Sequence, residues 1–296
     1  MNRLPLETRV RILSALVEGN SIRATSRMVG VSKDTAQKLL EDVGDACEAY
    51  HDENVRDLNI MLIQCDEIWT FCKAKESNIK PKDRRETIGD MWTWTAMDAQ
   101  RKLVITWTLG KRTPRFARRF MEDLAGRVKT IVQISTDGFG MYKPQIQRYF
   151  AKRADYGMDI KTYGRDMETY ETRYSPPTVI DRRRIRVLGV PDERYISTSI
   201  IERQNLTIEN VDAAFHELDQ WLLQEDGQPA TSARAALHVL QFLPGSLNAQ
   251  DDSGDCLAVD GPHLDASRSR EPARSHPRGG CGLTNDPQRI KNTVEQ

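Results

Sequence analysis

The chain has 296 residues, of which 39% are hydrophobic and 29% charged, as is usual for a soluble globular protein of one or two domains. It has no apolar run of the roughly 20 residues that a membrane helix needs, and its first residues lack the apolar core of a signal peptide. We therefore expect a cytoplasmic protein with no membrane partner. Residues 1–208 hold 36 basic and 29 acidic side chains, whereas residues 209–296 hold 7 and 14, so the basic part suits a polyanionic partner.

The cysteines form neither a C-x-x-C pair nor a Cys/His cluster with zinc spacing. We expect reduced, mostly buried thiols rather than a zinc site or a disulfide framework. The five residues are Cys47, Cys65, Cys72, Cys256 and Cys281.

Residues 6–46 predict three short helices. The first has apolar residues at helical spacing and stops at Gly19, the second begins at the N-cap Ser21 and ends at Gly30, and the third begins at Ser32. The short V-G-V-S link between the last two is typical of a helix-turn-helix.

In a helix-turn-helix the later helix enters the DNA major groove and a preceding helix contacts the phosphates. We expect the DNA-contacting residues to be Arg23, Arg27, Lys33, Asp34, Thr35, Gln37 and Lys38. A plain three-helix bundle with a solvated polar face would show the same pattern.

Residues 47–60 are polar and indicate a linker or a connecting helix, and an α/β pattern follows. The predicted elements are a buried strand over 60–71, a hairpin of strands over 91–99 and 102–110, a helix over 114–128, a strand over 128–138, a helix over 140–151 and a helix over 197–208. We expect residues 151–198 to be irregular, with a basic run at Arg182, Arg183, Arg184 and Arg186. This order predicts a helix-turn-helix domain over 1–50 and a ribonuclease H-like mixed-sheet catalytic domain over 59–208.

Three carboxylates stand out in the predicted catalytic domain. Asp66 interrupts an apolar strand, Asp137 ends a second strand before a glycine, and Glu202 follows two isoleucines on a helix. Three hard carboxylate ligands suit two magnesium or manganese ions, which can drive an in-line phosphoryl transfer. Taken singly, the second residue could be a turn aspartate and the third half of a surface ion pair.

Several phrases resemble the insertion-sequence-one family of transposases over about 59–208. They include D-E-I-W-T-F, G-D-M-W-T-W-T-A-M-D, S-T-D-G-F-G-M-Y, R-Y-S-P-P and S-T-S-I-I-E-R-Q-N-L-T. The resemblance implies a catalytic and metal-binding Asp-Asp-Glu triad of Asp66, Asp137 and Glu202. It also implies terminal inverted repeats and target DNA as substrates, and a homo-oligomer that pairs two element ends.

Four nearby residues are secondary candidates. Glu67 and Asp98 are the nearest competing carboxylates, and the second of these ends a strand where it could lie near a metal. Arg203 and Asn205 flank Glu202 and could orient it or contact DNA phosphate.

The resemblance stops after Ile208, where the family continues with an Arg-rich helix and a phrase like T-N-x-F-S-K-K. Codons for residues 216–229, read one nucleotide later, allow T-N-x-T-N-G-F-S-K-K. We therefore interpret residues 209–296 as an out-of-frame tail, which we expect to be disordered. A natural acidic tail is the alternative.

The leading hypothesis is a metal-dependent transposase that nicks element ends and joins them to target DNA, with this copy weakened or inactivated by its tail. Alternatives are a DNA-binding repressor or remnant that keeps only the helix-turn-helix, and a nuclease that does not join strands.

Overall fold

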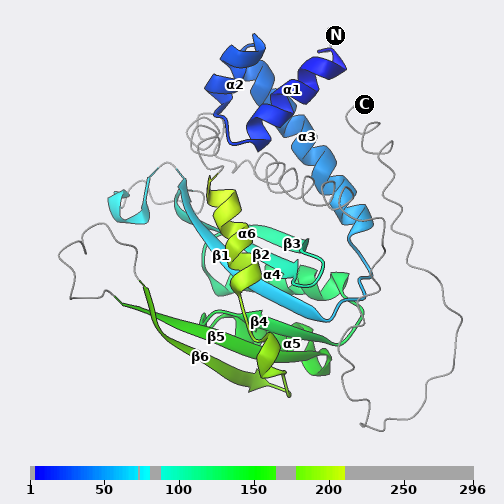
Figure 1. Ribbon diagram of the computed structural model, residues 1–296, viewed down its shortest axis with the longest axis vertical. Coiled ribbons are helices and arrows are strands. Elements are labelled where there is room, and N and C mark those ends of the chain that lie inside the picture. The colour runs from blue at the N-terminus through cyan, green and yellow to red at the C-terminus, as the bar shows by residue number, and fades with distance from the viewer. Residues whose placement is uncertain (1–3, 73, 81–87, 165–177, 211–296) are drawn as a thin grey trace, which may run out of the picture. The chain divides into compact units, whose positions relative to one another are not determined.

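The computed structural model describes residues 4–72, 74–80, 88–164 and 178–210, with residues 178 and 208–210 in backbone only (Figure 1). All of them belong to the first of two compact units, residues 1–242. Apart from its first two residues, the tail predicted over 209–296 lies outside the described residues, as does the R-Y-S-P-P phrase.

The first three helices form a small bundle and begin where the sequence predicts, while the third continues beyond its predicted end. They are α1 (Leu6–Val17), α2 (Ile22–Val29) and α3 (Lys33–Asn54). Ser21 and Ser32 cap α2 and α3 by accepting hydrogen bonds from the main-chain N–H groups three residues later, at 3.2 and 3.1 Å. Gly30 ends α2 with a φ of 76°, a left-handed conformation that glycine adopts without strain. Ile12, Leu16, Ile22 and Leu40 fill the centre of the bundle.

The connecting segment after the bundle is the second half of α3, which is 22 residues long. Of the two predicted alternatives for residues 47–60, the helix is the one observed up to Asn54. The domain boundary predicted at residue 50 therefore falls inside a continuous helix.

A six-stranded sheet follows, in the order β3-β2-β1-β4-β5-β6. Its strands are β1 (Leu62–Cys72), β2 (Gly89–Asp98), β3 (Leu103–Gly110), β4 (Val132–Thr136), β5 (Ala154–Gly164) and β6 (Thr178–Leu188). β1 pairs in parallel with β4, and β4 with β5, while the other pairs are antiparallel. The first five strands have the ribonuclease H-like order, so the predicted fold class is confirmed.

The prediction that residues 151–198 are irregular is wrong, because this segment contributes β5 and β6. Glycines, aspartates and a run of arginines, residue types with little preference for strands, hid both elements. A glycine is needed at position 157 because the Ile196 side chain packs onto the strand there, and a Cβ would lie 2.6 Å from it. The arginine run lies on β6, the edge strand, where charged side chains are common.

The sheet is covered differently on its two faces (Figure 1). On one face, α4 (Pro114–Arg127) and α5 (Tyr142–Tyr149) enclose the main core, in which Trp94 lies 5.7 to 6.0 Å from the rings of Phe120, Phe139 and Tyr142. On the other face, α6 (Ser199–Asn210) packs through Ile201 on Met97 and Val104. Three short 3-10 helices complete the described chain: Glu76–Asn78, Ala151–Arg153 and Glu193–Tyr195.

Three of the cysteines lie in the described residues as free thiols. Cys65 and Cys72 are buried, and burial raises the pKa of the half-buried Cys47 to about 11. Cys256 and Cys281 lie outside the described residues. Among the described helices, none combines the length and apolar composition needed to cross a membrane.

Candidate active site

Asp66 lies in the middle of β1, on the face that α6 covers. Its Oδ2 accepts a hydrogen bond of 2.8 Å from Nδ2 of Asn205 on α6. Burial is the main cause that raises the pKa of Asp66 to about 7, and the carboxylates of Asp137 and Glu202 raise it further. Two carboxylates that lie 71 and 136 residues farther along the sequence thus both act on Asp66.

Gln64 fixes the start of α6 above this site. It lies two residues before Asp66 and therefore on the same face of β1. Its Oε1 accepts hydrogen bonds of 3.0 Å from the N–H groups of both Ile200 and Ile201, two of the donors that a helix N-terminus leaves open. The next residue is Glu202. No role for Gln64 is predicted from the sequence, although a glutamine in an apolar strand indicates a buried polar contact in the same way as Asp66 does.

Glu202 forms an ion pair with a lysine of β5. Nζ of Lys161, on β5, lies 2.5 Å from both carboxylate oxygens of Glu202. The hydroxyl of Thr198 donates to Oε1 of the same carboxylate. Thr198 lies four residues before Glu202, but Lys161 lies 41 residues before it, so no pattern in the sequence indicates this arrangement.

Asp137 follows β4 in a tight turn. Its Oδ1 accepts a hydrogen bond of 2.9 Å from the N–H of Phe139, so part of the carboxylate shapes the turn. The side chain is 42% exposed, and its Oδ2 lies 4.0 Å from the Arg112 guanidinium. The turn prediction for this residue is therefore confirmed, and its role as a metal ligand stays a prediction.

Glu67 faces the opposite side of β1 from Asp66. Its carboxylate is buried, and Arg112 pairs with it at 2.8 Å. The guanidinium lies over the rings of Trp92 and Phe139, at 4.5 and 3.8 Å from their centroids. Burial raises the pKa of Glu67 to about 7 despite the opposing effect of Arg112. Arg112 therefore supports the Asp137 turn from behind, through Phe139.

Two of the secondary candidates lie elsewhere. Asp98 caps the β2–β3 turn, where Oδ1 accepts from the N–H groups of Gln100 and Arg101 and Oδ2 pairs with the Arg101 guanidinium. This corrects the expectation that Asp98 lies near a metal. Arg203 is exposed on α6, and Asn205 orients Asp66 instead of Glu202.

The donor set of the site fits hard divalent cations. Its acids are carboxylates whose mutual repulsion contributes to the raised pKa of Asp66, and the buried Oδ1 of Asn205 has no hydrogen-bond partner among the described residues. Within those residues no three acidic, histidine or cysteine side chains are gathered into a ligand shell. Both oxygens of Glu202 face the ammonium of Lys161.

The predicted DNA-contacting residues of the α1–α3 bundle, called the head below, are mostly accessible. Arg23, Arg27 and Lys38 are exposed, and Lys33 and Thr35 are half-buried. Gln37 is a correction: it is 1% exposed and donates to Glu41 at 3.2 Å, so it faces the bundle and cannot reach a base edge.

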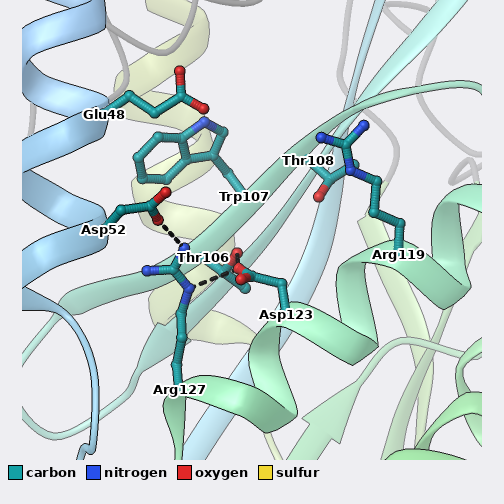
Figure 2. A pocket seen from close by; sticks show the side chains of 8 residues that line it. All are labelled: Glu48, Asp52, Thr106, Trp107, Thr108, Arg119, Asp123 and Arg127. Atoms are coloured by element: carbon teal, nitrogen blue, oxygen red, sulfur yellow. Dashed lines mark hydrogen bonds and ion pairs between the residues drawn. The ribbon is translucent and has the colours of Figure 1, made fainter.

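A second ionic cluster joins the end of α3 to β3 and α4 (Figure 2). The buried guanidinium of Arg127 lies between the carboxylates of Asp52 and Asp123, with which it pairs. It also donates to His51 Nδ1 at 3.3 Å, and His51 Nε2 lies 3.0 Å from the Val104 carbonyl oxygen. Because Nδ1 accepts, Nε2 carries the proton. Burial lowers the pKa of His51 to about 4.

A polar cavity of about 160 Å³ lies beside this α3–α4 junction. Glu48 and Arg119 line it together with Asp52, Asp123 and Arg127 of the ionic cluster (Figure 2). Burial, and then Asp52 and Asp45, raises the pKa of Glu48.

No family model and no curated protein matches this chain. Among solved structures it is similar to a Mos1 strand transfer complex, at 12% identity and a TM-score of 0.25, over 86% of this chain and 80% of the other. It is also similar to Mos1 mariner paired-end complexes with Mn and with Mg, at 12 and 13% identity and TM-scores of 0.26 and 0.25. These cover 84 and 86% of this chain and 78 and 81% of the other chains.

Proposed function

We propose that this chain is a DNA transposase of the insertion-sequence-one type, a metal-dependent polynucleotidyl transferase that nicks element ends and joins them to target DNA. The observation that carries the proposal is the position of Asp66 in a ribonuclease H-like sheet: it is hydrogen-bonded to Asn205 on the helix that bears Glu202, and the carboxylates of Asp137 and Glu202 both raise its pKa. Each of them belongs to a phrase that resembles the family, and the three come from β1, the end of β4 and α6.

In this proposal the three carboxylates bind two magnesium or manganese ions. Such ions activate a water or a 3′-hydroxyl and stabilise the leaving oxygen of an in-line transfer. The chain's own contribution is placement: Gln64 fixes the start of α6, and Asn205 orients the Asp66 carboxylate toward the site.

The head is proposed to bind the terminal inverted repeats. The exposed Arg23, Arg27 and Lys38 on α2 and α3 are suitable for phosphate and groove contacts. Joining of two element ends needs two active sites and two heads, so we propose a homo-oligomer as the active form.

A joining assay tests the proposal. Purified protein is incubated with magnesium, target plasmid and a labelled duplex that carries the inverted repeat flanking the gene. We expect weak or no joining by the chain as it stands, and nicked and joined products from a version whose reading frame is restored after Ile208. Both products should disappear in the Asp137→Asn variant of the restored version, while binding of the duplex is kept. Nicking that never yields joined product would favour the nuclease, and products that persist in the variant would contradict the assignment of the site.

A second candidate is a DNA-binding repressor or remnant. The head has its own capped helices and its own core, and all of them precede the point where the family resemblance ends. Specific binding without any nicking would favour this candidate. If a version with the reading frame restored after Ile208 then joins DNA, the out-of-frame tail is the defect.

A further inference from the structure

Lys161 is placed where its ammonium pairs with both carboxylate oxygens of Glu202. Its side chain is 13% exposed, and its ammonium lies 2.5 Å from Oε1 and from Oε2 of Glu202. Its third contact, at 3.4 Å, is the hydroxyl of Thr198. A single buried cation is therefore shared between the two oxygens that Glu202 could offer to a metal ion.

The nearest arginine has a different partner. Arg182 lies opposite Lys161 in the β5–β6 register, but its guanidinium donates to both oxygens of the buried Asp159, at 2.8 and 2.7 Å. Because that bidentate pair is satisfied, Arg182 is not available to take over Glu202. Displacing Lys161 thus leaves Glu202 without an ion-pair partner in direct contact among the described residues.

We propose that Lys161 is a positioning residue that competes with the metal: its ammonium holds Glu202 at the site in the metal-free protein and must release at least one oxygen before a divalent ion binds. An ammonium and a divalent cation on the same carboxylate repel each other, so metal binding includes the cost of moving Lys161. The inference rests on the proposed function, because it takes Glu202 as a metal ligand. A purely structural role for Lys161 predicts the opposite sign, since loss of support would weaken metal binding.

The test is titration of full-length protein with Mn²⁺ alone, with free Mn²⁺ followed by its electron paramagnetic resonance signal. Lys161→Met keeps the length of the side chain and removes its charge, and Lys161→Gln keeps a hydrogen-bond donor. We expect both variants to bind Mn²⁺ with a Kd about tenfold lower than the wild type, the scale of one opposite charge at contact distance. We also expect a lower Tm than the wild type in EDTA, where nothing replaces the ammonium.

Lys111→Met is the matched control. Lys111 is 19% exposed and pairs with Glu76 at 3.2 Å, away from the three candidate ligands, so its removal should leave the Kd unchanged. Asp137→Asn sets the background of nonspecific binding.

Three results would count against the inference. A Kd in folded Lys161→Met or Lys161→Gln equal to or higher than that of the wild type overturns the competition and leaves the proposed metal site standing. A decrease in Kd that Lys111→Met reproduces shows a general charge effect and overturns it as well. If neither the wild type nor the Lys161 variants bind above the Asp137→Asn background, the proposed metal chemistry and this inference both fail.

Discussion

The candidate active site and the α3–α4 junction contain the same kinds of side chain but balance their charges differently. The site has four carboxylates and two cations: Asp66, Glu67, Asp137 and Glu202 with Arg112 and Lys161. The junction has three of each: Glu48, Asp52 and Asp123 with Arg56, Arg119 and Arg127. Burial, and to a smaller extent the neighbouring carboxylates, raises the pKa of two acids of the site to about 7. A balanced cluster is suited to hold segments together, and one with surplus negative charge is suited to bind a cation.

Asp66→Asn tests the surplus negative charge of the site most directly, and it has the largest expected effect on joining. In the version whose reading frame is restored after Ile208, removing a metal-binding carboxylate should reduce joining by at least about 1,000-fold, or roughly 4 kcal/mol of transition-state stabilisation. The same change should raise the Tm at pH 8 in EDTA, because it removes a charge that burial disfavours. Joining assays and calorimetry measure the two effects.

Asp98→Asn is the matched control, because Asp98 is equally an aspartate of the sheet but serves the β2–β3 turn. It should lose stability and keep joining activity. An Asp66→Asn variant that joins DNA normally, or that is less stable than the wild type at pH 8, would contradict the comparison.

Arg127→Met tests the balanced cluster. It leaves Asp52 and Asp123 without their shared cation and removes donors to His51 and the Val55 carbonyl. Breaking a buried pair from one side destabilises strongly, and because Asp52 is half exposed we expect a loss of about 3 kcal/mol in urea unfolding.

Arg119→Met is the control for this prediction, since Arg119 is exposed and lines the same cavity. Its effect should stay within about 0.5 kcal/mol. Equal losses for the two variants would show that the junction is not held by Arg127.

The predictable parts of the fold depended on short-range patterns. Serine caps, the glycine stop and apolar spacing located the three head helices, and β-branched and aromatic runs located β1 to β4. β5 could not be predicted because its burial comes from neighbouring strands and its own residues do not indicate it. β6 could not be predicted because it is an edge strand with mostly exposed and charged residues. Gln37 was misplaced for a related reason: it lies three residues before Leu40 and therefore shares the buried stripe of α3.

The carboxylates of the site were visible in the sequence, but the residues that hold them were not. Asp66 and Glu202 drew attention because an acid among apolar residues is costly without a partner. The partners are contributed over long separations, such as 139 residues from Asn205 to Asp66 and 41 from Lys161 to Glu202. Only the sheet order makes these pairs neighbours, so a single sequence does not reveal them.

Asn205→Leu tests how the surplus charge is kept in place, with a smaller expected effect. The variant leaves the Asp66 carboxylate without its amide donor and should destabilise the protein by about 1 to 2 kcal/mol in urea unfolding. Joining should fall together with stability, because Asp66 loses its orientation.

Arg203→Gln is the control on the same helix, at an exposed position that does not contact Asp66 in the described contacts. Stability should stay unchanged in that variant. If Asn205→Leu is as stable as the wild type, the amide does not support the carboxylate.

The acids of the site and His51 of the junction should contribute to stability with opposite dependences on pH, which is the smallest expected effect. The pKa of Asp66 and of Glu67 is raised in the folded protein to about 7, so their stabilising contribution is complete below about pH 4 and is lost as the pH rises to 7. The pKa of His51 is lowered from 6.5 to about 4, so its contribution is complete above pH 6.5 and is lost as the pH falls toward 4. The raised pKa of Glu48 acts in the same direction as those of Asp66 and Glu67, so His51 opposes three acids. The wild type in EDTA should therefore be slightly less stable at pH 7 than at pH 4.5, by about 1 kcal/mol after solvent screening. Asp66→Asn should flatten this dependence because it removes one of the three acids, and His51→Gln should steepen it. Thermal unfolding at half-unit steps of pH measures the three profiles, and the same slope in all of them would show that the charge balance of the clusters does not govern their stability.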